Sequence, residues 1–151
     1  MAKYKPITDV RYLVVHCAAT PPNMDIGAKD IDLWHRRNGW FMIGYHNVIR
    51  RNGTIEAGRP LDRPGAHAQG FNEISLGVCL VGGVKSLPEA EPENNFTAEQ
   101  FNSLEQLLRQ WKHMHPQAQI VGHSSLPSPH ARLKACPSFD VQAWLKTVGL
   151  D

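Results

Sequence analysis

Short apolar runs and periodic apolar stretches alternate along the chain. The run YLVVHC, residues 12–17, is apolar almost throughout, and SLGVCLV, residues 75–81, repeats this pattern before Gly82 and Gly83. Unbroken apolar runs of this length, bounded by glycine or polar residues, are typical of strands that are covered on both faces. Residues 120–123 form a third, shorter run. We therefore expect three buried strands at these places.

Helical spacing is clearest after Thr97. Thr97 and Gln100 have the spacing of a capping box, in which each side chain accepts a hydrogen bond from the other residue's backbone N–H. Five apolar residues follow at helical spacing, namely Phe101, Leu104, Leu107, Leu108 and Trp111. Residues 140–148 form a further amphipathic segment that ends before Gly149, and residues 26–38 form another that ends before Gly39. The pattern predicts three helices.

A hairpin completes the predicted elements. Residues 46–51 and 54–57 flank an Asn-Gly pair, which is the strongest short hairpin signal. Residues 84–95 are rich in Pro, Glu and Asn and predict a surface loop. Strands that alternate with helices predict an α/β fold, with a central mixed sheet of about five strands flanked by helices on both faces.

Length and charge narrow the class of protein. We expect one domain over residues 1–151, with residues 1–10 as a loosely ordered N-terminal arm. The formal charge is only +2 and the basic residues are scattered, which argues against nucleic acid as a partner. There is no apolar stretch of signal-peptide length before Asp9 and none long enough to span a membrane, so we expect synthesis in the cytoplasm and no membrane partner. Three cysteines, an odd number, favour thiols or metal ligands over a disulfide framework.

The first candidate for a functional side chain is His16, which ends an otherwise apolar strand. Side chains alternate along a strand, so His16 shares a face with Val14, and Cys17 points to the other face. His123 ends the run QIVGH, and Cys136 follows a Pro-rich loop. Two imidazoles and a thiolate suit zinc and leave a fourth position for water. The spacing alone leaves two interpretations open, a shared metal site or separate, hydrogen-bonded histidines.

Several longer segments carry a family resemblance. In chain order they are VVHCAAT, WHRRNGWFMIGYHNVIRRNGTIEAGRP, GAHAQGFNEISLGVCLVGG, FTAEQFNSL and KACPSFDVQAWL. They resemble the phage lysozyme branch of the zinc N-acetylmuramoyl-L-alanine amidases, relatives of the peptidoglycan recognition proteins, from about residue 12 to about residue 146. The resemblance implies an amidase-like α/β fold, one Zn²⁺ per chain and peptidoglycan as the substrate. It also implies a monomeric endolysin, made in the host cytoplasm, that needs another factor such as a holin to reach the wall.

The resemblance also implies roles for particular residues. His16, His123 and Cys136 would bind Zn²⁺, and Tyr45 and Lys134 would be catalytic. Zinc polarises an amide carbonyl and lowers the pKa of bound water, while a lysine cation and a tyrosine hydroxyl can stabilise a developing oxyanion. The physics of amide hydrolysis therefore agrees with these identities.

Substrate contacts and the general base are less sharply defined. In the family pattern His67, in GAHAQG, contacts substrate at the groove. Trp40, which precedes the active-site tyrosine, is either a core anchor or a residue that lines the groove. No glutamate sits in a zincin-type motif, so the group that takes the proton of the attacking water stays open. Glu56 and Glu73 are the nearest candidates by motif position, although solvated surface roles suit both better.

Three alternatives remain open. A peptidoglycan-binding module without catalysis would lack a metal ligand in this superfamily, whereas Cys136 is present here. A cysteine hydrolase would use Cys136 as a nucleophile and would tolerate a zinc chelator. A regulatory protein partner away from the groove is neither indicated nor excluded. The chain also departs from many relatives at Ser124-Ser125, where Arg-Asp often follows the histidine, and in the loop 126–133, which affects the surroundings of His123 and the rim of the groove.

The remaining histidines and cysteines have simpler expected roles. We place His35 on the exposed side of its helix, and we expect His46, which points away from Tyr45 on its strand, to make a core hydrogen bond. Cys17 and Cys79 are expected to be small buried apolar residues.

Overall fold

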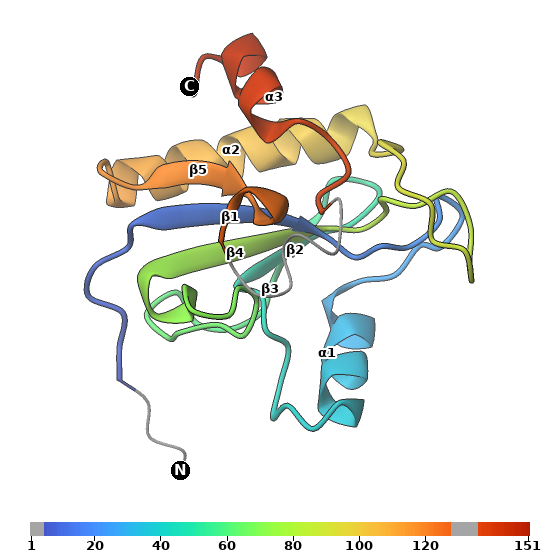
Figure 1. The fold of residues 1–151 in the computed structure, drawn as a ribbon, viewed down its shortest axis with the longest axis horizontal. Helices are drawn as coiled ribbons and strands as arrows, with labels where there is room; N and C mark the ends of the chain where they lie inside the picture. The colour runs from blue at the N-terminus through green and yellow to red at the C-terminus, as the bar shows by residue number, and fades with distance from the viewer. Residues whose placement is uncertain (1–4, 128–135) are drawn as a thin grey trace.

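A mixed sheet forms the centre of the computed structural model, which describes residues 5–127 and 136–151 (Figure 1). Within these residues the sheet has five strands in the order β3-β2-β4-β1-β5. Three pairs are parallel, β1 with β4, β1 with β5 and β2 with β4, and β2 pairs with β3 antiparallel. The strands are β1 (Tyr12–Cys17), β2 (Asn47–Ile49), β3 (Ile55–Ala57), β4 (Ser75–Leu80) and β5 (Gln119–Gly122). The predicted α/β class and mixed sheet are confirmed.

Helices cover both faces of this sheet. Helices α2 (Ala98–Met114) and α3 (Val141–Val148) lie on one face, and α1 (Ala28–Arg37) lies on the other (Figure 1). The predicted capping box of α2 is present, since Thr97 Oγ1 accepts from the Gln100 N–H at 3.1 Å and Gln100 Oε1 accepts from the Thr97 N–H at 3.0 Å. Among the described residues, no helix combines the length and the apolar character needed to cross a membrane.

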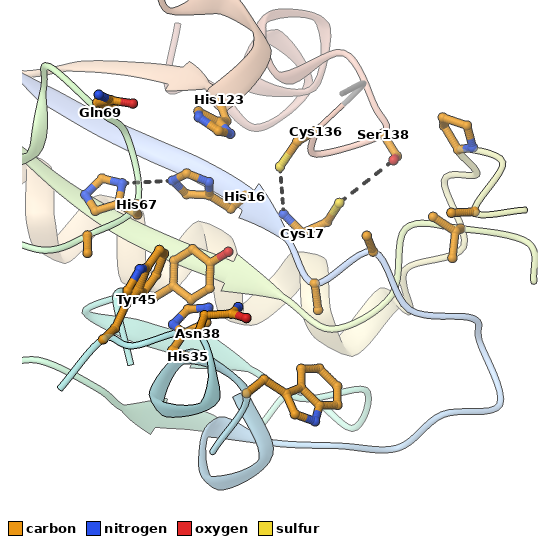
Figure 2. A pocket seen from close by; sticks show the side chains of 18 residues that line it. His16, Cys17, His35, Asn38, Tyr45, His67, Gln69, His123, Cys136 and Ser138 are labelled. Atoms are coloured by element: carbon orange, nitrogen blue, oxygen red, sulfur yellow. Dashed lines mark hydrogen bonds between the residues drawn. The ribbon is translucent and has the colours of Figure 1, made fainter. Parts of the chain in front are cut away.

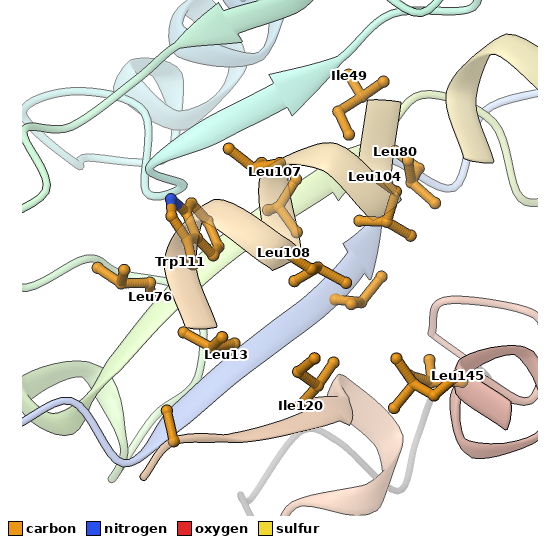
Figure 3. Close-up of a cluster of buried hydrophobic side chains, with 14 of the residues drawn as sticks. Leu13, Ile49, Leu76, Leu80, Leu104, Leu107, Leu108, Trp111, Ile120 and Leu145 are labelled. Atoms are coloured by element: carbon orange, nitrogen blue, oxygen red, sulfur yellow. The ribbon is translucent and has the colours of Figure 1, made fainter. Parts of the chain in front are cut away.

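The α2 face holds the main apolar core (Figure 3). Aliphatic side chains from β1, β4 and β5 pack there against α2 and α3. Its most buried large members are Leu13, Ile49, Leu76, Leu80, Leu104, Leu108, Trp111 and Leu145. Leu and Trp side chains at the predicted helical spacing therefore supply the burial that holds α2 against the sheet.

At the hairpin and at His123, the ends of the strands differ from the sequence prediction. The hairpin strands stop at Ile49 and resume at Ile55, because Arg50 and Thr54 already belong to the turn, where the Arg50 N–H donates to the Thr54 carbonyl. His123 does not end β5 but begins a short 3₁₀ helix, η2 (His123–Ser125), whose turn is closed by the Leu126 N–H donating to the His123 carbonyl.

The N-terminal segment contacts the folded body. Val10 is buried in the α2 core, Ile7 packs against that core, and the Ile7 N–H donates to the Asp62 carbonyl at 2.7 Å. Residues 1–4 of the predicted arm lie outside the described residues.

Side chains alternate along the central strands, so every second residue lies on the face opposite the apolar core. Parallel pairing of β1 with β4 sets three residue pairs on the face opposite the apolar core, namely Tyr12 with Ser75, Val14 with Gly77 and His16 with Cys79. One face of the sheet is therefore aliphatic, and the other carries polar and sulfur-containing side chains at its centre.

Candidate metal centre and its pocket

Three side chains from distant parts of the chain meet at the end of the sheet. His16 ends β1, His123 begins η2, and Cys136 follows the segment that leads out of η2. One potential ligand atom of each lies within 4.8 Å of the other two (Figure 2). The structure thus brings together the three residues that were predicted to share a metal ion.

Backbone contacts hold Cys136 in this group. The Cys17 N–H donates to Cys136 Sγ at 3.1 Å, and the Ser124 N–H donates to the Cys136 carbonyl at 2.9 Å. Residues next to the two histidines therefore also position the sulfur. Ser124 takes part in this tether through its backbone N–H.

The Cys136 thiol is in a setting that favours its protonated form. The neighbouring Cys17 thiol, and then burial, raise the pKa of Cys136 well above its ordinary value. A divalent cation at this place would supply the missing positive charge and displace the proton. Two imidazole nitrogens and one sulfur form a donor set that suits zinc and similar borderline-soft ions, so these residues fit a metal.

His16 has a second imidazole directly beside it. Its Nε2 lies 2.9 Å from Nδ1 of His67, and the two rings are close to perpendicular. On the far side of His67, Nε2 lies 3.3 Å from the Ser75 hydroxyl. His67, which was predicted to contact substrate, lines the pocket, but both of its ring nitrogens face protein groups and the residue is only 9% exposed.

Tyr45 also lies beside His16. The ring centroids of Tyr45 and His16 are 5.1 Å apart, and the Tyr45 hydroxyl points into the pocket on the side of His16 (Figure 2). Burial, together with the nearby thiols of Cys79, Cys136 and Cys17, raises the pKa of Tyr45 well above its usual value. The hydroxyl therefore keeps its proton near neutral pH and can act as a hydrogen-bond donor.

The ligand cluster lies in the wall of a pocket of about 900 Å³. Trp40 is 41% exposed at this pocket, and its ring centroid lies 4.4 Å from that of His35. Ala18, Gln69 and Ser138 also line it. A volume of this size can hold a drug-sized or short peptide segment.

The expected position of His35 is wrong. His35 is half-buried and lines the pocket, and its Nδ1 accepts a hydrogen bond from the Gly44 N–H at 2.9 Å. Burial, and then the Arg59 cation, lower its pKa. The sequence did contain a signal for this placement, because His35 is four residues after Ile31, which is buried on the same face of α1. His46, by contrast, makes the predicted core hydrogen bonds, to the Arg63 carbonyl at 2.7 Å and from the Gly77 N–H at 3.0 Å.

The remaining predicted residues are Lys134, the loop 126–133 and two glutamates, Glu56 and Glu73. Lys134, and with it most of the loop 126–133, lies outside the described residues. Glu56 accepts a hydrogen bond from the Ala28 N–H at the start of α1, and neither Glu56 nor Glu73 is among the described residues that line the pocket.

Known proteins share both the sequence pattern and the fold. Residues 6–139 match the family model described as N-acetylmuramoyl-L-alanine amidase. The chain is 47% identical over 133 residues to the endolysin of Enterobacteria phage K11, which covers 88% of this chain and 83% of that protein. It is 40% identical over 142 residues to the endolysin of Escherichia phage T7, which covers 94% of this chain and 88% of that protein.

Solved structures extend this similarity to the fold. The N-acetylmuramoyl-L-alanine amidase LysC from Clostridium intestinale superposes with a TM-score of 0.77 at 25% identity, over 99% of this chain and 96% of that one. Bumblebee PGRP-SA superposes with a TM-score of 0.74 at 21% identity, over 95% of this chain and 85% of that one, which is a likeness of fold alone. The amidase-like architecture expected from the sequence is confirmed.

Proposed function

Because the chain belongs to the N-acetylmuramoyl-L-alanine amidase family, we propose that it is a zinc-dependent endolysin. Its reaction is hydrolysis of the amide between the lactyl group of N-acetylmuramic acid and the L-alanine of the stem peptide in peptidoglycan. The observation that carries this proposal is the meeting of His16, His123 and Cys136 in a pocket beside Tyr45.

His16, His123 and Cys136 would hold one Zn²⁺. When bound, zinc polarises the scissile carbonyl and lowers the pKa of bound water, and the fourth coordination position stays open for that water. A thiolate ligand leaves the site less positive than a third imidazole would, so further hydrogen-bond donors near the carbonyl become more useful.

Tyr45 and Lys134 would supply those donors. The raised pKa of Tyr45 keeps its hydroxyl protonated, and this hydroxyl would donate to the oxygen that becomes negative in the tetrahedral transition state. Lys134 would place a cation near the same oxygen. Trp40 would form an apolar wall of the pocket against the substrate. His67 would act through its contact with His16 rather than by touching the stem peptide.

Product analysis tests the reaction. Digestion of purified peptidoglycan should release new alanine amino termini and no new reducing sugar ends. New sugar ends would mean glycosidase activity and would overturn the proposal. Binding to peptidoglycan without new amino termini would favour the non-catalytic module instead.

Metal analysis tests the zinc site. We expect about one zinc per wild-type chain and almost none in Cys136→Ala, with amidase activity lower by about 10³-fold or more, since metal catalysis contributes several kcal/mol to the barrier. Cys79→Ala, which removes another buried thiol outside the ligand set, should keep its zinc. A chelator should abolish activity and lower the Tm of the wild type, whereas a cysteine hydrolase would keep its activity.

We further propose that the cellular role is lysis of a bacterial host, with the protein acting as a monomer on the wall from the cytoplasmic side. Expression in bacteria should lyse the cells only when the inner membrane is permeabilised by a second protein. Lysis without permeabilisation would contradict this route, and no lysis in either case would contradict the role.

A further inference from the structure

The second inference concerns the groups behind His16 and rests on the metal site of the proposed function. We propose that Ser75 and His67 are positioning residues which fix the tautomer of His16, so that His16 carries its proton on Nε2 and presents the Nδ1 lone pair to the metal. The chain of contacts runs from the Phe71 carbonyl through Ser75 and His67 to His16.

The positions of the protons follow from the Phe71 carbonyl at the start of these contacts. A carbonyl oxygen can only accept, and the Ser75 hydroxyl donates its one proton to the Phe71 carbonyl at 2.7 Å. Ser75 Oγ therefore has only acceptor capacity left toward His67. Since Nε2 of His67 lies 3.3 Å from Ser75 Oγ, this nitrogen must be the one that carries a proton.

The state of His67 follows from its burial. His67 is only 9% exposed, and among the described residues no carboxylate forms an ion pair with it, so a second proton would bury a positive charge without a counter-charge, and the ring is neutral. A neutral imidazole has one N–H and one acceptor nitrogen. With the proton on Nε2, Nδ1 of His67 is the acceptor.

The acceptor nitrogen of His67 then determines which nitrogen of His16 carries a proton. Nε2 of His16 lies 2.9 Å from Nδ1 of His67 and must donate to it. An imidazole that binds a metal is neutral, so the lone pair of His16 is then on Nδ1. A metal-ligating histidine commonly uses its other N–H in this way, because the partner orients the ring and increases its basicity as a ligand.

The fold keeps His67 in place for this task. A Cβ at Gly77 would come within 2.7 Å of Cγ and Nδ1 of His67, and a Cβ at Gly65 would come within 2.6 Å of its Cδ2. Both glycines thus make room for the ring. Asn72 Oδ1 accepts from the backbone N–H groups of His67 and Ala68, each at 2.9 Å, and fixes the loop that carries the ring.

Nitrogen NMR of the chelator-treated wild-type protein is the direct test. The ¹⁵N shifts and ring-proton couplings should show the Nε2–H tautomer for both His16 and His67. An Nδ1–H tautomer at His16 would overturn the inference, even if every variant proved difficult to fold.

Zinc affinity provides a second test, measured by competition with a chromophoric chelator. Ser75→Ala should weaken zinc binding by about 10- to 100-fold and give a mixture of His16 tautomers. The matched control is Ser103→Ala, which also removes a hydroxyl that donates to a backbone carbonyl, that of Gly53, but lies away from the pocket. This control should leave both readouts unchanged.

Two substitutions of His67 separate its acceptor from its bulk. In His67→Asn the amide oxygen can take the place of Nδ1 and accept from His16, whereas in His67→Gln the amide reaches the place of Nε2. We expect His67→Asn to retain most of the zinc affinity and His67→Gln to lose about 10-fold or more. Unchanged zinc affinity and tautomer in Ser75→Ala and His67→Gln would overturn the inference, while the absence of zinc binding by the wild type would overturn the proposed function itself.

Discussion

The two faces of the central sheet differ in what their side chains do. On strand β4, the side chains of Leu76, Val78 and Leu80 point toward α2. Those of Ser75 and Cys79 point toward the opposite face, on which Gly77 also lies. We call this the histidine face, because it carries His16, His46 and His67. Side chains that alternate along one strand therefore serve the apolar core and the candidate site in turn. The difference shows that this fold separates the source of its stability from the place of its chemistry by the thickness of a single sheet.

The two faces are also stabilised by different interactions. The α2 face gains stability from removal of aliphatic area from water, which is not directional. The histidine face buries polar rings, which is unfavourable unless each ring nitrogen has a partner. His46 and His67 meet this condition through specific hydrogen bonds, so geometry matters more on this face than volume.

A cavity on the α2 face should give the largest loss of stability and leave the site intact. Leu108 has no exposed surface and lies in the core of that face. Leu108→Ala should lower the free energy of unfolding by about 2–5 kcal/mol, while the folded protein keeps its zinc affinity. Denaturant unfolding and chelator competition measure the two quantities. A parallel loss of zinc affinity would show that the faces are not independent.

Acid should destabilise the histidine face selectively. Burial is the main reason why the pKa of His46 is lowered to about 4, although its hydrogen bond to the Arg63 carbonyl acts in the opposite direction. The unfolded chain has a histidine pKa of about 6.5, so this stability is present above that pH and is lost as the pH falls toward 4, by roughly 3 kcal/mol.

Denaturant midpoints between pH 7 and pH 4, in the presence of a chelator, measure this loss. The pKa of His35 is lowered as well and adds to the trend. A His46→Asn variant should show a smaller dependence on pH than the wild type. An equal slope in both proteins would mean that His46 does not titrate as described.

Loss of the Tyr45 hydroxyl should affect turnover and little else. Tyr45→Phe keeps the ring that packs beside His16, so zinc content and Tm should stay close to those of the wild type. We expect kcat to fall by about 100-fold, the usual effect of removing one oxyanion donor. Activity within a few-fold of the wild type would exclude the proposed role of this hydroxyl.

The substitution Gly77→Ala, which adds a single methyl group, should give the smallest of these effects and the most specific one. The new Cβ would force the His67 ring to shift, and we expect zinc affinity to fall by about 10-fold, or about 1.4 kcal/mol. Val78→Ala, one residue further on the opposite face, is the control and should lower stability without changing zinc affinity. Equal zinc affinity in both variants would contradict the cradle formed by Gly77.

Much of the architecture could be predicted from local patterns. The apolar run of β1, the capping box of α2 and the Asn-Gly turn each depend on neighbours within a few residues, and each was found where it was expected. Element ends were less accurate at the hairpin and at His123, because hydrogen bonds of the adjoining turns decide where a strand stops. The proposal that His16, His123 and Cys136 are metal ligands came from the family resemblance, since spacing alone left a shared site as one of two interpretations.

The sequence by itself determined which residues lie on the same face of each strand or helix, because that depends only on the period of the element. The tertiary structure decided which of these faces meet. His16 and His67 are 51 residues apart, and Cys17 and Cys136 are 119 apart, yet both pairs form direct hydrogen bonds. Such contacts arise from parallel strand pairing and from the course of the connecting loops. No local pattern contains that information, which is why the contact between His67 and His16 could not be predicted from the sequence.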